Sequence, residues 1–227
     1  MTIKTTVYYK SLPTSDIADV TGLTTGTFAG NGTIDLLIDA QGTSNVDTFM
    51  LNADLSDFNI QKGKESILVT HDDLPDVVLS MRDIERLESP TQGIAFDVNG
   101  DAGEIYALLA TALGKDDVTP GLVGIGLELK DQGKTDTEIA QILLSSTVYK
   151  EDALGSSNET LVKQIYKNIL GTTPSLADLI YFTGLLDNGT FTQAQLLEVA
   201  SNLELARDAD HINLVGMASI EYTPFAV

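Results

Sequence analysis

The chain has 227 residues, of which 43% are hydrophobic, so it is long enough for two domains and apolar enough to bury a core. Its 33 acidic residues outnumber its 13 basic residues, and the formal net charge of -20 at pH 7 makes nucleic acid and anionic lipid surfaces unexpected partners. The absence of cysteine excludes disulfides, thiolate metal sites and a cysteine nucleophile.

The N-terminal sequence MTIKTTVYYKSLPTSD lacks the apolar core of a signal peptide. No run of 18 or more apolar residues occurs further along the chain, so we expect no membrane span. If the protein leaves the cell, we therefore expect export without a cleaved N-terminal signal.

Residues 1–96 are predicted to form an all-β domain. Short runs of β-branched, aromatic and aliphatic residues alternate with polar ones and are separated by glycine-containing turns. The expected strands are residues 2–9, 33–38, 48–51, 58–61, 66–70 and 77–79. Short strands at this spacing favour a sandwich or a roll-like fold.

After residue 97 the apolar spacing becomes helical, and one helical motif is written twice. The first copy covers residues 102–151 and the second covers 160–207, a period of about 56 residues. The matched pairs are Leu109 with Tyr166, Gly114 with Gly171, Leu122 with Leu179, Gly133 with Gly189, and Ser145 with Ser201. We expect at least three helices per copy, packed as one bundle over residues 97–222, and hence an α+β chain with a tail at 223–227.

Several residues mark where these helices begin and end. Pro120 and Pro174 stand near helix starts, and Asn188-Gly189 forms a turn that ends a helix. Thr135 followed by Glu138 has the form of a capping box. Residues 212–218 are predicted to be a helix that unwinds into an extended apolar end, which either packs back on the protein or is free for a neighbour.

An acidic turn precedes the first helical copy. Asp97, Asn99, Asp101 and Glu104 place oxygen atoms as the opening of a calcium loop does. The EF-hand pattern is incomplete, because its later glycine and glutamate positions hold Ala102 and Leu108. The same residues are also explained by a helix N-cap at Asn99 or Asp101, with Glu104 in the first turn.

A second acidic turn contains His71, Asp72, Asp73 and Asp76. Its carboxylates could share a Ca2+ ion, but turn statistics favour a solvated loop between two strands. His211 is too distant in sequence from His71 to indicate a zinc site. Tyr166, Tyr181 and Phe182 follow the helical period and are predicted to be core residues.

The sequence resembles bacterial secreted proteins in which a β segment leads into a helical domain of unknown function. The matching residues are 83–87 (DIERL) and 94–103 (IAFDVNGDAG), followed in the second copy by Ile165-Tyr166, Leu170-Gly171, Pro174, Leu179 to Phe182, Gly189, Ser201 and Glu204. In that family the β segment is related to hemolysin-type (RTX) calcium-binding proteins. The resemblance implies calcium binding and export by a type I system that reads an uncleaved C-terminal signal.

No nucleophile elbow, metalloprotease helix or phosphate-binding loop occurs in the sequence. The sequence therefore favours a non-enzymatic, extracellular or cell-surface structural or adhesive protein that self-assembles with calcium. We expect a homo-oligomer or polymer that forms through the N-terminal strand, residues 2–9, or the C-terminal segment, residues 217–227. The alternatives are a carbohydrate-binding or carbohydrate-active module that contacts cell-surface glycans, and a phage virion surface protein.

Overall fold

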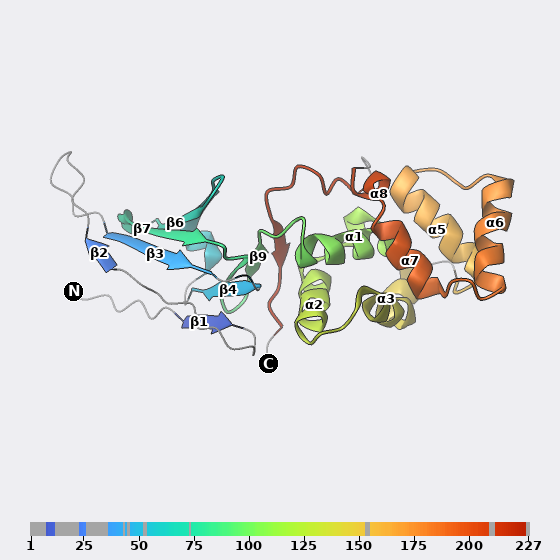
Figure 1. The fold of residues 1–227 in the computed structure, drawn as a ribbon, viewed down its shortest axis with the longest axis horizontal. Helices are drawn as coiled ribbons and strands as arrows, with labels where there is room; N and C mark the ends of the chain where they lie inside the picture. Colours follow the sequence, from blue (N-terminus) through green and yellow to red (C-terminus); the bar gives the residue numbers. More distant parts are fainter. Residues whose placement is uncertain are drawn as a thin grey trace. The chain divides into compact units, whose positions relative to one another are not determined.

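The computed structural model describes residues 8–11, 23–25, 36–42, 44, 46–51, 54–72, 74–152, 155–208 and 212–225. The chain divides into two compact units, Met1–Phe96 and Asp97–Val227. The described strands of the first unit are followed by the helices of the second (Figure 1). The predicted α+β fold class is therefore confirmed.

The first unit contains two small mixed sheets. Strands lie in the order β2-β3-β7-β6-β5 in one sheet and β1-β4-β8-β9 in the other. The β3–β7 and β4–β8 pairs are parallel, and the other described pairs within this unit are antiparallel. The strands are β1 (Tyr8–Ser11), β2 (Leu23–Thr25), β3 (Leu36–Gln41), β4 (Asp47–Met50), β5 (Phe58–Lys62), β6 (Ile67–His71), β7 (Leu74–Arg82), β8 (Arg86–Glu88) and β9 (Gly93–Ala95), with a 3-10 turn, η1 (Leu55–Asp57), before β5.

Both sheets contribute to one core. Phe49 of β4, Met81 of β7 and Leu87 of β8 are fully buried in the same cluster. Burial alternates along β4, where Asp47 and Phe49 are buried and Thr48 and Met50 are half-buried. The first part of the expected N-terminal strand, residues 2–7, lies outside the described residues, as do residues 33–35.

The second unit contains eight α-helices in its described residues, and they form two sets of four. Copy one consists of α1 (Asp101–Leu113), α2 (Pro120–Asp131), α3 (Asp136–Ser145) and α4 (Thr147–Asp152). Copy two consists of α5 (Asn158–Leu170), α6 (Leu176–Asp187), α7 (Gln193–Ser201) and α8 (Glu204–Asp208). Each helix of copy one has a counterpart of similar length in copy two, and the short α4 and α8 add a fourth helix to the three expected per copy.

The helix starts show how the two copies align. Thr119 caps α2 and Ser175 caps α6, while Thr135 and Thr192 open α3 and α7 with complete capping boxes. The capping box predicted at Thr135 is confirmed. The second box, in which Gln195 takes the place of glutamate, was not predicted.

These caps correct two of the predicted residue pairs by one position. The caps of α2 and α6 align Leu179 with Val123 instead of Leu122. Those of α3 and α7 align Ser201 with Leu144 instead of Ser145. The connections differ in length between the copies, since copy one has an extra 3-10 turn, η2 (Lys115–Asp117), before α2.

Helix α1 is the centre of the helical unit. It packs against α2 and α3 of its own copy and against α5 and α7 of copy two. Every residue from Ala107 to Leu113 is buried. Helix α2 comes close to α1 at Gly126, where a Cβ atom would stand 2.4 Å from Cγ2 of Ile105. Gly126 therefore serves close packing of α2 on α1.

The predicted helix over residues 212–218 is wrong. This segment consists of turns, in which Asn213 and Gly216 have the positive φ angles of 53° and 91° that a helix does not allow. It leads into a short strand, β10 (Ile220–Tyr222). The backbone N–H of Thr223 donates a hydrogen bond of 2.9 Å to the carbonyl oxygen of Pro120 in α2, so this end packs back on the helical unit.

Gly124 of α2 makes this packing possible, and its substitution tests it. A Cβ atom at Gly124 would stand 1.9 Å from the carbonyl oxygen of Thr223. We predict that Gly124→Ala lowers the free energy of unfolding by about 1–3 kcal/mol, because backbone must shift to admit the methyl group. Urea unfolding of the full chain measures this change.

Gly184 of α6 is the matched control. It has no neighbour within 4 Å of its Cβ position, so Gly184→Ala should leave stability unchanged or raise it by up to ~1 kcal/mol through helix propensity. Equal effects of the two substitutions would contradict the close contact between α2 and the C-terminal segment.

Candidate functional site

The predicted acidic turn caps helix α1, but through a different residue from those expected. The N-cap position is Gly100, which has no side chain to accept a hydrogen bond. The Asp97 carboxylate accepts a hydrogen bond of 3.0 Å from the backbone N–H of Ala102, and its backbone carbonyl accepts others from Gly100 and Gly103. Capping therefore comes from Asp97, and the expectation of Asn99 or Asp101 as the cap is wrong. Asn99 is exposed.

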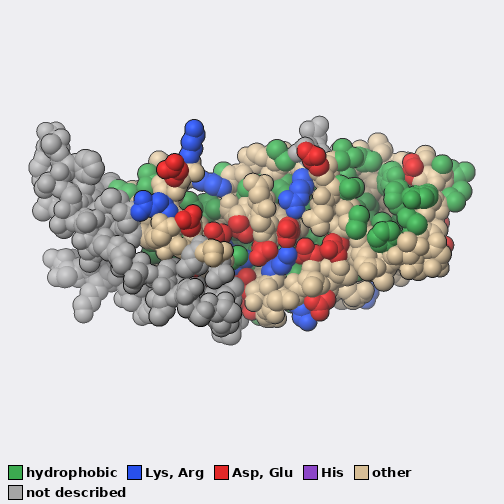
Figure 2. Space-filling view, viewed as in Figure 1, with side chains coloured by type: hydrophobic (Ala, Val, Ile, Leu, Met, Phe, Trp, Pro, Cys, Tyr) green, Lys and Arg blue, Asp and Glu red, His purple; other side chains and the backbone are tan. Residues whose placement is uncertain are grey.

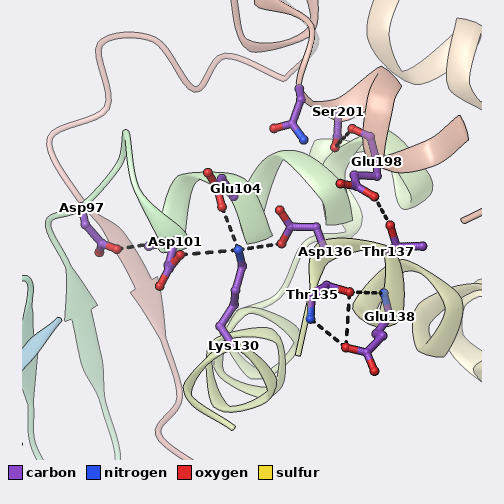
Figure 3. A network of polar contacts seen from close by, with 12 residues as sticks. Asp97, Asp101, Glu104, Lys130, Thr135, Asp136, Thr137, Glu138, Glu198 and Ser201 are labelled. Atoms are coloured by element: carbon purple, nitrogen blue, oxygen red, sulfur yellow. Dashed lines mark hydrogen bonds and ion pairs between the residues drawn. The ribbon is translucent and has the colours of Figure 1, made fainter. Parts of the chain in front are cut away.

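Lys130 of α2 lies at the centre of the remaining acidic residues (Figure 3). Its Nζ atom is 2.8 Å from Oε2 of Glu104, 2.7 Å from Oδ1 of Asp136 and 3.5 Å from Oδ1 of Asp101. Only 14% of the Lys130 side chain is exposed. The carboxylates come from α1 and α3, so the ammonium group joins three helices of copy one. We call Asp101, Glu104, Lys130 and Asp136 the lysine cluster.

The electrostatics of the lysine cluster favour the charged form of Lys130. Burial acts to lower the pKa of this side chain, but hydrogen bonds to Asp136 and Glu104 together outweigh burial. The pKa of Lys130 therefore lies above the ordinary lysine value of 10.5. At neutral pH the ammonium group stands among the carboxylates, in the place that a bound cation would need.

Copy two connects the equivalent helices without an ion pair at these positions. The counterparts of Asp101, Glu104, Lys130 and Asp136 are Asn158, Leu161, Leu186 and Gln193. Gln193 donates a hydrogen bond of 2.8 Å to the Asn158 amide oxygen, and Asn158 donates one of 2.7 Å to Asp187. Both copies therefore use these positions to connect helices, which indicates a structural role.

The second acidic turn lies between strands β6 and β7. Asp72 is exposed, Asp73 lies outside the described residues, and Asp76 belongs to strand β7. The His71 ring packs edge-on against Phe58, with ring centroids 5.0 Å apart. Among the described residues no group of three or more His, Asp or Glu side chains is placed to hold a metal ion. Calcium binding at either predicted site stays a prediction.

An apolar groove lies in copy two, between α5, α6, α7 and α8. Its volume is about 200 Å³. Figure 2 shows hydrophobic side chains gathered at the α6 end of the helical unit. The groove is lined by Val162, Ile165, Tyr166, Ile169, Leu170, Phe182, Leu196, Val199, Ala200, Leu203 and Leu205. None of these side chains is charged, so the groove is suited to an apolar surface rather than to polar chemistry.

An aromatic cluster forms the α6 side of this groove. The rings of Tyr166 and Phe182 lie 6.0 Å apart, and those of Phe182 and Tyr181 lie 5.2 Å apart. Tyr181 is nevertheless 62% exposed, so the prediction that it is a core residue is wrong. The available signal was that α6 is apolar on nearly every side, which is unusual for a helix with one buried face.

Comparison of α2 with α6 explains why only copy two has this surface. Gly124 and Gly126 of α2 admit the C-terminal segment and α1 at close range. Their counterparts in α6 are Ile180 and Phe182. Leu186 is the only residue of α6 that is buried. These larger side chains therefore lie on α6 of copy two, whereas α2 of copy one is covered at its glycines by the C-terminal segment and by α1.

Residues 140–204 match the model of a protein family described as a domain of unknown function (DUF4214). The matched region begins within α3 and ends at the start of α8, so it includes most of the helices around the groove. No curated protein and no solved structure matches the chain. Within the described residues, no helix has both the length and the apolar character required to cross a membrane.

The lysine cluster predicts a specific pattern of stability. Lys130→Leu should lower the free energy of unfolding by roughly 2–3 kcal/mol, because three carboxylates lose their shared partner while keeping part of their solvation. Urea unfolding measures it. Since the folded pKa of Lys130 is raised, its contribution is complete below the unfolded pKa and is lost only as pH rises through the folded value. The difference from wild type should therefore stay constant between about pH 6 and 9.

The matched control replaces all four residues of the lysine cluster by their counterparts from copy two. Combining Lys130→Leu with Asp101→Asn, Glu104→Leu and Asp136→Gln should recover at least half of the lost stability, because no unpaired carboxylate remains. A quadruple variant that is less stable than Lys130→Leu alone would contradict the equivalence of the two sets of residues.

Proposed function

We propose that this chain is a non-enzymatic structural or adhesive protein that assembles with copies of itself at a bacterial cell surface. One observation carries the proposal: the folded helical unit leaves an uncharged, apolar surface exposed in copy two. Leu176 is 73% exposed and Ile180 is 63% exposed, beside a groove with uncharged walls. Concentrated apolar surface of this kind marks sites of association with other proteins.

The acidic residues support a structural function more than a catalytic one. Asp101, Glu104 and Asp136 surround Lys130, and Asp97 caps a helix. The groove has no acid, base or nucleophile beyond the tyrosine hydroxyl of Tyr166. An enzyme site needs several polar groups that converge where a substrate binds.

The sheet edge offers a second route to assembly. Strand β1 lies at the end of the order β1-β4-β8-β9, and an edge strand can pair with a strand from a neighbouring chain. The C-terminal segment is less suited to that role, because Ile220 and Tyr222 are buried and Thr223 is hydrogen-bonded to α2. We therefore propose the N-terminal strand as the second contact.

Calcium and export belong to the same proposal. The formal charge of -20 opposes the approach of identical chains, and a divalent cation would offset part of this repulsion. The resemblance to RTX-related proteins supports an extracellular location and type I export, and both stay proposals.

Sedimentation and electron microscopy of the purified full chain test the proposed assembly. In calcium at about 1 mM, the range in which extracellular calcium modules bind, we predict sedimentable particles, sheets or filaments. A chelator should loosen them, because carboxylate repulsion returns.

Magnesium and sodium chloride at equal ionic strength are the controls for the calcium experiment. If the three salts act identically, calcium has no specific role. A chain that stays monomeric in every salt, and that gives a specific signal on a glycan array, would contradict self-assembly and support the carbohydrate-binding alternative.

A further inference from the structure

We propose that the apolar surface of copy two is the contact between two identical chains related by a two-fold axis. This inference rests on the proposed self-assembly and identifies the surface that begins it. The copy-two patch consists of Leu170, Leu176, Ile180, Tyr181, Val199, Leu203 and Leu205. Four of these, namely Leu170, Val199, Leu203 and Leu205, also line the groove.

The copy-two patch is the place where two strongly acidic chains can meet at low electrostatic cost. The chain carries a formal charge of -20, so most of its surface repels a second copy. The residues of the patch and the walls of the groove are uncharged. The two acids of α6 are engaged locally, since Asp178 accepts a hydrogen bond from Ser175 and Asp187 accepts one from Asn158.

The size of the patch also fits a protein partner. Its seven large apolar residues are each between 37% and 73% exposed, and a standard interface buries ~800 Å² on each partner. Ile142 and Val148, which are exposed apolar residues of copy one, are 45% and 43% exposed, less than Leu176, Ile180 and Tyr181 of α6. A patch of this size on a folded monomer indicates an interface.

The internal packing of copy one argues against an extended segment as the occupant. In copy one, α2 accepts the C-terminal segment because Gly124 lets the carbonyl oxygen of Thr223 approach. The counterpart in α6 is Ile180, which is 63% exposed and carries a branched side chain where α2 has none. A branched side chain keeps backbone at a distance, so the copy-two patch is better suited to packing against side chains, as helices do.

The chain itself shows that this helical motif associates with its own kind. Helix α1 packs on its counterpart α5, and α3 packs on its counterpart α7. Asn168 donates a hydrogen bond of 3.0 Å to the carbonyl oxygen of Thr111, which holds the same position in the other copy. Contacts between equivalent positions are typical of a two-fold relation. A second copy of the chain presents the same kind of helical surface.

A two-fold axis also matches the shape of the surface. The exposed Tyr181 ring projects from α6 beside a groove that Leu203 and Leu205 border on the α8 side. In a symmetric dimer, Tyr181 of each chain enters the groove of the other, so both contacts form at once. Buried tyrosines at the centre of an interface carry much of its binding energy.

Sedimentation velocity of the full chain in chelator tests this dimer apart from calcium-dependent assembly. Wild type should change from monomer to dimer between about 1 and 100 μM. Tyr181→Glu should raise the dissociation constant at least ~30-fold, because two carboxylates would be buried in apolar grooves. The control is Ile125→Glu, at the equivalent position of α2, which is 45% exposed and should leave dimerisation unchanged.

Cysteine cross-linking provides an independent readout, since the chain has no cysteine. A mixture of Tyr181→Cys chains and Leu203→Cys chains should form a mixed disulfide dimer on oxidation, and a mixture of Ile125→Cys with Leu203→Cys chains should not. Circular dichroism confirms that each variant is folded.

Two results would overturn the proposed dimer. One is a wild-type chain that stays monomeric across the whole concentration range. This holds even if an apolar dye binds in the groove and its binding depends on Tyr181, because the groove would then take a small ligand instead of a second chain. The other is a dimer that Tyr181→Glu leaves intact and that gives no mixed disulfide. Neither result would affect calcium-dependent assembly through strand β1, so the two proposals can fail separately.

Discussion

The burial of residues 107–113 of helix α1 is the constraint on which the helical unit depends. Every residue from Ala107 to Leu113 is buried, because helices of both copies cover this segment. Its counterpart α5 has one solvated side and carries Lys163 and Lys167 there. Neither copy can bury α1 alone, so the two copies form one cooperative core, as adjacent repeats do.

The two copies differ at equivalent positions in the same way as α1 and α5 differ in burial. In copy one, Gly124 and Gly126 let neighbouring backbone and side chains approach, and Lys130 neutralises the acids at the helix junction. In copy two, larger apolar residues occupy the glycine positions and amides replace the ion pairs. Helix α2 of copy one is therefore closely packed, whereas α6 of copy two carries exposed apolar side chains.

The sequence predicted what depends on local spacing. The α+β order, the helical repeat and the capping box at Thr135 all follow from patterns within a few residues. Contacts between distant residues were not predictable in this way. Lys130 lies far along the chain from Asp101 and Glu104, so the sequence did not show that a lysine pairs with these acids. The acidic turn therefore resembled a loop that binds a metal cation. The exposure of Tyr181 depends on which helices cover α6, and a helix that is apolar on nearly every side does not show which of its sides stays uncovered.

The net charge of the chain limits how a surface of this kind can be used. Apolar burial is short-ranged and favours contact by about 25 cal/mol per Å², whereas repulsion between acidic chains acts over a Debye length of about 8 Å in physiological salt. At an uncharged patch, apolar burial can favour contact where the repulsion between the acidic chains is weakest. Contacts elsewhere on the chain need screening by cations, so association through copy two and calcium-dependent growth through the sheet edge are separable steps with different salt dependence.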